Sequence, residues 1–175
     1  MYERIINFIA QFIINRFIRH KHTESTVYNN FFSDSKNILL IYPESDTEFD
    51  SAGIVPEYLW GTKKNLTLFV PEQKVSTLNQ KWKARVLTFS LKDKTRLNLP
   101  SHNLSKLLEN ENFDVVIDLN ISDNLFFSAI TNYVTSKFKI GFKKDRSDKY
   151  YNFQVPSQIN AENSYRNLLN SLKMF

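Results

Sequence analysis

The sequence predicts one α/β domain on a mainly parallel β-sheet flanked by helices, with an extra amphipathic helix at the N-terminus. Three observations predict it. Short apolar runs rich in β-branched residues, typical of strands buried on both faces, alternate with amphipathic stretches. These stretches have the length of the helices that connect parallel strands. With 175 residues, 42% of them hydrophobic and 23% charged, the chain can bury the core of a single domain.

The N-terminal segment, residues 1–22, is predicted to be an amphipathic helix, with the helical pattern running over 2–20. It has one narrow polar stripe and a wide apolar face. An apolar face of this width is expected to pack against another surface rather than face water. Its uncharged stretch, 5–15, is shorter than the roughly 20 residues that cross a bilayer, and no signal-peptide cleavage pattern follows. Two interpretations stay open: packing on the domain or on a second chain, or lying in a membrane interface. The residues expected to contact the membrane or a partner are Ile5, Phe8, Ile9, Phe12, Arg16 and Arg19.

A polar connector over 23–35 leads into the main domain, 36–175. Strands are expected at 38–42, 66–70, 85–89, 113–119 and 138–142, with a further short strand within 150–155. Helices are expected at 50–60, 72–81, 101–109, 123–135 and 161–173. Asp50 is a suitable cap for the first of these, and Gly61 ends it. This alternation predicts right-handed crossovers and a Rossmann-like sheet.

The composition excludes several kinds of site. The chain has no Cys, which excludes disulfides and thiolate metal sites, and its three His have no metal-binding spacing, so no metal is expected. The first strand leads into Pro43-Glu44-Ser45-Asp46 instead of a glycine-rich phosphate loop, and no Walker A motif occurs. We therefore expect no cofactor. Without a zinc-finger spacing or an RNP-like motif, nucleic acid is not an expected partner.

The net charge of +5 is concentrated in two parts of the chain, the N-terminal segment and residues 137–149. Basic patches of this kind meet anionic lipids or phosphorylated ligands. The second part contains Lys137, Lys139, Lys143, Lys144, Arg146 and Lys149.

Several segments follow one another in a characteristic order. Residues 36–41 (KNILLI) include most of the first expected strand, Asp50 lies six residues before Pro56, and the later expected strands read FDVVIDL and KFKIGF. Over 36–145 this order resembles the N-terminal domain of glycosyltransferase family 9, the heptosyltransferases of lipopolysaccharide assembly. Phe49 replaces the glycine that precedes the family's Asp. The sequence also contains no counterpart of the family's C-terminal domain, which holds the nucleotide-sugar donor.

The resemblance implies roles for three sets of residues. Asp50 would be a general base that deprotonates an acceptor hydroxyl, and the alternative is that it caps a helix. Asp118 and Asn120 would line an acceptor pocket, and the alternative is that Asp118 and Asp123 cap the next helix. Phosphate groups of the acceptor would meet Lys143, Lys144 and Arg146, and the alternative is a solvated basic loop.

The sequence therefore predicts a non-catalytic or partner-dependent glycosyltransferase-like binding protein. One alternative is an active subunit of a split glycosyltransferase that acts on a lipid-linked or phosphorylated sugar acceptor. Another is a membrane-surface scaffold subunit. We expect no activity from the chain alone, and a bacterial, cytoplasmic protein that is either free or peripheral at the inner face of the membrane. A protein partner or a second copy would bind through the N-terminal helix.

Overall fold

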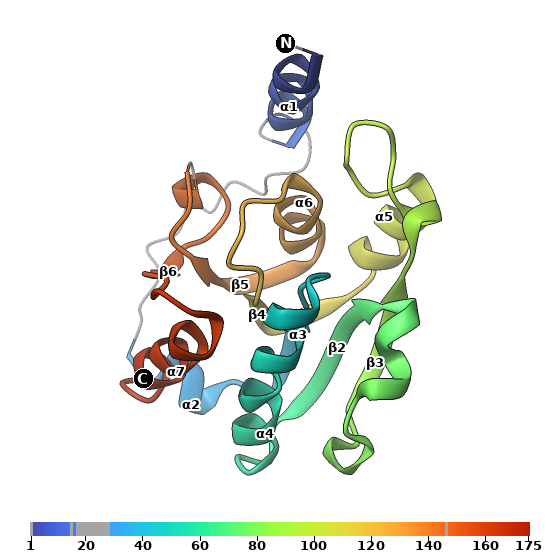
Figure 1. The fold of residues 1–175 in the computed structure, drawn as a ribbon. Helices are drawn as coiled ribbons and strands as arrows, with labels where there is room; N and C mark the ends of the chain where they lie inside the picture. The colour runs from blue at the N-terminus through green and yellow to red at the C-terminus, as the bar shows by residue number, and fades with distance from the viewer. Residues whose placement is uncertain (1, 15, 17–28, 146) are drawn as a thin grey trace.

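The computed structural model describes residues 2–14, 16, 29–145 and 147–175, with side chains from Phe8 onwards. Within these residues a six-stranded, all-parallel sheet has the strand order β3-β2-β1-β4-β5-β6 (Figure 1). This confirms the predicted α/β class and Rossmann-like parallel sheet. The strands are β1 (Asn37–Ile41), β2 (Asn65–Pro71), β3 (Arg85–Phe89), β4 (Asn112–Asp118), β5 (Thr135–Phe142) and β6 (Phe153–Val155).

The helices lie between the strands as predicted, with differences in their bounds. They are α1 (Tyr2–Ile13), α2 (Phe31–Asp34), α3 (Asp46–Ala52), α4 (Ile54–Trp60), α5 (His102–Glu109), α6 (Leu125–Tyr133) and α7 (Ala161–Leu172). The helix predicted over 50–60 is wrong in its start and its continuity, because α3 begins earlier and α4 follows as a second helix. Pro56 has no N–H to donate to the carbonyl of Ala52, which explains the break. The helix predicted over 72–81 is instead two 3₁₀ segments, Glu72–Thr77 and Gln80–Trp82.

The central strand β1 separates two apolar cores. Leu40 packs with residues of α3, α4 and α7 on one face of the sheet, and Leu39 packs with residues of α5 and α6 on the other. Both side chains are fully buried, as the continuous apolar run predicts for a strand covered on both faces. Because β4 lies beside β1 rather than beside β3, the strand order reverses between β1 and β4, and their carboxyl ends form the topological switch point of the sheet.

Helix α2 forms within the predicted polar connector. Phe31 and Phe32 are both buried, and the ring of Phe31 lies 4.3 Å from that of Phe138 and 5.0 Å from that of Phe175, between centroids. Two adjacent aromatic side chains in a polar segment were the signal for this element.

Helix α1 packs against α6 at one end of the molecule (Figure 1). Ala10 and Ile14 are fully buried in a cluster with Leu125 of α6 and with Tyr150 and Tyr151. The end of the predicted helix, 17–20, lies outside the described residues. Among the helices that are described, none combines the length and hydropathy needed to cross a membrane.

A carboxylate joins the starts of two central strands. Asp114 Oδ2 of β4 accepts hydrogen bonds from the backbone N–H groups of Lys36, at 2.8 Å, and Asn37, at 2.9 Å.

Replacing Asp114 with Ala leaves both donors without this partner, and we expect a loss of about 1 to 2 kcal/mol in the free energy of unfolding. Urea unfolding measures it. The matched control is Glu109→Ala, an exposed position of α5, with an expected change within about 0.5 kcal/mol. Equal effects of the two substitutions would contradict this role of Asp114.

Candidate functional site

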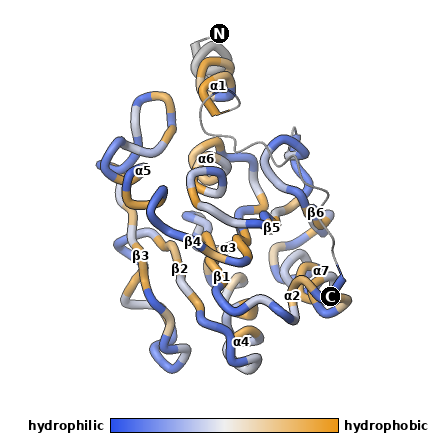
Figure 2. Tube along the Cα trace, turned by 180° about the vertical axis from the view of Figure 1, so that it is seen from behind, coloured by the Kyte–Doolittle hydropathy of each residue, from blue (hydrophilic) through white to orange (hydrophobic). Residues whose placement is uncertain are grey.

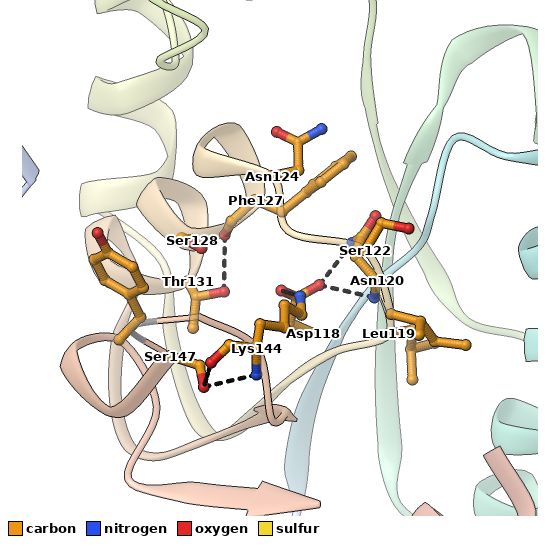
Figure 3. Close-up of polar contacts among 12 residues, drawn as sticks. Asp118, Leu119, Asn120, Ser122, Asn124, Phe127, Ser128, Thr131, Lys144 and Ser147 are labelled. Carbon is orange, nitrogen blue, oxygen red and sulfur yellow. Dashed lines mark hydrogen bonds and ion pairs between the residues drawn. The ribbon is translucent and has the colours of Figure 1, made fainter. Parts of the chain in front are cut away.

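The carboxyl ends of β1 and β4 lie side by side, and the site is built on the loops that follow these strands and β5. Asp118 is the last residue of β4 and is paired in register with Ile41, the last residue of β1. In Figure 3 the carboxylate of Asp118 lies between Asn120 on one side and Lys144 on the other. Asp118 is completely buried.

Both carboxylate oxygens of Asp118 have partners. Oδ1 accepts from the backbone N–H of Asn120, at 3.0 Å, and from its side-chain amide, at 2.6 Å. Oδ2 accepts from Lys144 Nζ, at 3.3 Å, and from the hydroxyl of Tyr151. A buried carboxylate is tolerated only with such compensation, so these partners are required by its burial.

The structure brings the predicted pair Asp118 and Asn120 together with Lys144. The alternative role of Asp118 as a helix cap is wrong. The cap of α6 is Asn124, whose side chain accepts from the backbone N–H of Phe126 at 3.0 Å. Asp118 lies seven residues before the helix begins, and its side chain is directed to Lys144 and Tyr151 instead.

The three predicted phosphate-binding cations have different environments. The Lys144 side chain is 5% exposed, so the interpretation of a solvated loop is wrong for this residue. Lys143 is exposed. Arg146 lies outside the described residues. The turn at Lys144 is closed by Ser147, whose hydroxyl accepts from the backbone N–H of Lys144 and donates to its carbonyl.

Tyr151 completes the site, although its position in the sequence predicts only that it lies near the short strand expected within 150–155. Burial raises the pKa of the Tyr151 hydroxyl well above 10, and the negative charge of Asp118 adds to the effect. The hydroxyl therefore stays protonated and donates to Asp118. Its ring packs on Gly141, where an added Cβ would lie 2.8 Å from the ring carbons. A glycine inside a strand pattern, as in KFKIGF, is a sequence signal of such a close approach.

Asp50 lies apart from this network. Its side chain is exposed on α3, and among the described residues its carboxylate has no hydrogen-bond or ion-pair partner. The alternative that it caps a helix is wrong, because α3 begins at Asp46. Its neighbour Phe49 is buried, with its ring 4.9 Å from that of Tyr42.

A different carboxylate of α3 connects the two central loops. Glu48 Oε2 accepts from the backbone N–H of Ile121, and Oε1 accepts from the hydroxyl of Ser122, each at 3.2 Å. Sequence reasoning missed Glu48, because only the fold brings α3 to the loop after β4.

The loop that follows β1 is held by lysines of the same chain. Lys94 Nζ lies 2.6 and 2.7 Å from the carboxylate oxygens of Glu44 and 4.8 Å from the ring centroid of Phe126. Lys74 Nζ donates to the carbonyl of Glu44 at 2.6 Å and pairs with Asp46 at 2.7 Å. The charges of this loop are thus satisfied within the chain.

Lys139 is a second buried cation outside this network. It is 1% exposed, and its Nζ lies 3.4 Å from Asn132 Oδ1 of α6. Burial lowers the pKa of the Lys139 ammonium from 10.5 to about 8. The charge pattern of the sequence predicts that Lys139 belongs to a basic surface patch, but in β5 the residue is buried in the interior.

Exposed polar side chains near the site are able to form hydrogen bonds and ion pairs. Within the described ranges, no group of three or more His, Cys, Asp or Glu side chains is arranged to hold a metal ion. Hydroxyl, carboxylate and ammonium groups of Ser122, Asp50 and Lys143 remain exposed near the loops.

Comparison with known proteins identifies a shared fold. The sequence matches no known protein family and no curated protein. The structure is similar to that of the heptosyltransferase WaaC from E. coli solved with ADP, with a TM-score of 0.52 and 15% sequence identity. The similarity covers 77% of this chain and 46% of the E. coli chain. The chain therefore has the fold of part of a heptosyltransferase and spans about half of its length.

The Lys144–Asp118 ion pair predicts unequal effects of substituting two adjacent lysines. Lys144→Met leaves the buried Asp118 carboxylate without its cation, and we expect a loss of about 3 to 5 kcal/mol in the free energy of unfolding. The control Lys143→Met removes an exposed cation, with an expected change within about 0.5 kcal/mol. Urea unfolding at pH 7 measures both. A mild effect of Lys144→Met, similar to that of the control, would show that Asp118 does not depend on this cation.

Burial of Lys139 predicts a pH dependence of stability. Below pH 8 the amine is charged in the folded and the unfolded chain, and between about pH 8 and 10.5 it is charged only in the unfolded chain. The unfolded chain then binds more protons, so the contribution of Lys139 to stability rises with pH. We expect Lys139→Met to stabilise the protein at pH 7 by up to about 3 kcal/mol, with the gain disappearing towards pH 10.5.

Unfolding free energies of this variant and of the wild-type protein across this pH range test the prediction. Lys137→Met, at an exposed position of the same strand, is the control and should run parallel to the wild type. A gain for Lys139→Met that does not change with pH would contradict it.

Proposed function

We propose that the chain is a glycosyltransferase-like binding unit that holds a phosphorylated sugar at the carboxyl edge of its sheet. Any transfer reaction then needs a donor-binding domain outside these 175 residues. Two findings support this. The chain shares the heptosyltransferase fold but spans only 46% of the length of WaaC. Moreover, the strand-end carboxylate of the site is not available for chemistry.

The state of Asp118 is the observation that carries the proposal. A general base must reach the hydroxyl of the substrate and accept its proton. Asp118 is completely buried, and Lys144 and Tyr151 both donate to its Oδ2. Its role in this arrangement is to position the loop after β5, which leaves binding as the function of the surface above it.

The loop after β1 is poorly suited to bind the phosphate groups of a nucleotide. The structure of the E. coli protein contains ADP. Phosphate groups bind where backbone N–H groups and free cations converge. Here the loop carries Glu44 and Asp46, and the lysines beside it, Lys74 and Lys94, are already paired with these carboxylates.

The phosphorylated sugar is assigned from the polar groups that remain exposed at this edge. Lys143 follows β5 directly and offers an unburied ammonium to a phosphate. Ser122 is exposed on the loop after β4, and its hydroxyl, which donates to Glu48, is able to accept a hydrogen bond from a sugar hydroxyl.

A split glycosyltransferase is the second candidate function, and the exposure of Asp50 favours it. Its carboxylate is at the protein surface on α3, and among the described residues it has no partner that would have to be displaced. In a reaction reconstituted with a donor-binding partner, Asp50→Asn would abolish transfer and leave binding of the acceptor unchanged.

Calorimetric titration of the full chain tests the proposed function. We expect glucose 1-phosphate to bind, and Lys143→Glu to weaken this binding about tenfold, because the substitution turns attraction to the phosphate into repulsion. Lys63→Glu changes the same charge just before the amino end of β2 and should leave binding unchanged. We expect no binding of ADP or ADP-glucose. Binding of either nucleotide by the chain alone would contradict the proposal.

A further inference from the structure

Helix α1 presents the aromatic side chains of Phe8 and Phe12 to solvent. Ala10 and Ile14 are fully buried against the domain, whereas Phe8 is 68%, Ile9 41% and Phe12 58% exposed. Helices on a protein surface normally turn their large apolar side chains to the core. Among the described side chains from Phe8 onwards, Ala10 and Ile14 are buried and the larger side chains of Phe8, Ile9 and Phe12 are exposed. Such an exposed apolar row is typical of a surface that contacts a partner or a membrane.

The loop over 90–100 also carries an exposed apolar side chain. Leu97 and Leu99 pack in the same cluster as Ala10 and Ile14, so the base of the loop is fixed next to α1. Leu91 on this loop is 83% exposed. Figures 1 and 2 both show α1 and this loop at one end of the molecule and α4 at the opposite end.

Exposed positive side chains occur on the same two segments as these apolar residues. Arg16 is exposed and follows the end of α1, four positions after Phe12. Lys92 and Arg96 are exposed on the loop that carries Leu91. Apolar side chains beside lysine and arginine match the two layers of a membrane interface, acyl chains and anionic headgroups.

We propose that this end of the molecule docks on an anionic membrane surface, with Phe8, Ile9, Phe12 and Leu91 in contact with the lipid and Arg16, Lys92 and Arg96 in contact with headgroups. We call these seven residues the docking face. The inference goes beyond the proposed function and is independent of it, because it uses none of the residues assigned to the sugar phosphate.

The charge of the docking face distinguishes a membrane from a second copy of the chain. A symmetric dimer brings the same surface of two protomers together. Arg16 and Arg96 would then face the cations of the other protomer, and such repulsion opposes association. Anionic headgroups neutralise the same cations, so the membrane is the occupant that fits the charge.

Flotation of the full chain with lipid vesicles tests the inference. We expect the protein to float with mixed phosphatidylcholine–phosphatidylglycerol vesicles and to bind pure phosphatidylcholine vesicles about tenfold more weakly. The double substitution Phe8→Ser, Phe12→Ser should lower the partition coefficient on the mixed vesicles by at least about tenfold. Arg16→Glu with Arg96→Glu should weaken it by a similar factor and remove its salt dependence.

Matched controls lie at the far end of the molecule. Trp60→Ser removes an exposed aromatic side chain at the end of α4, and Lys63→Glu changes an exposed cation nearby, and neither should alter flotation. Unchanged urea unfolding shows that the variants are folded. Equal binding of the wild type and the Phe8→Ser, Phe12→Ser variant to the mixed vesicles would overturn the inference. It would also be overturned by light scattering that shows a dimer which this variant dissociates, without vesicle binding by the wild type.

Discussion

The buried pair of Asp118 and Lys144 organises the carboxyl edge of the sheet. Removing two charges from water is unfavourable, and here the effect is offset because Asn120 and Tyr151 also donate to the carboxylate. These contacts hold the loop after β5 against the end of β4. That loop carries Tyr150 and Tyr151, which form part of the surface on which α1 packs. One set of polar contacts thus positions both the candidate site and the N-terminal helix.

The same arrangement separates fold from activity. A sheet edge of this type usually presents strand-end side chains to a ligand. Here Asp118 and Lys144 neutralise each other, and Lys94 does the same for Glu44. The similarity to part of a heptosyltransferase therefore describes the scaffold, and the paired charges are the reason to propose binding instead of catalysis by the chain alone.

The lysines within residues 137–149 are close together in the sequence but differ in solvent exposure. Lys137 and Lys143 are exposed, whereas Lys139 lies in the interior and the Lys144 side chain is almost fully buried. Side chains of a strand alternate between its two faces. Near the edge of a sheet, however, the helices and loops that cover each face determine which positions are exposed to solvent. Net charge cannot distinguish a lysine in solvent from one beside a buried carboxylate.

The sequence by itself determined the α/β class, the positions of the strands and the amphipathic helix, because apolar runs and their periods are local properties. Only the tertiary structure decided the roles of the polar residues, since those depend on contacts between distant segments. Tyr151 lies 33 residues after Asp118, and Ile121 lies 73 residues after Glu48. No local pattern encodes such pairs. Which face of α1 is buried likewise depends on the tertiary structure, because Ala10 and Ile14 pack on a surface formed by distant segments.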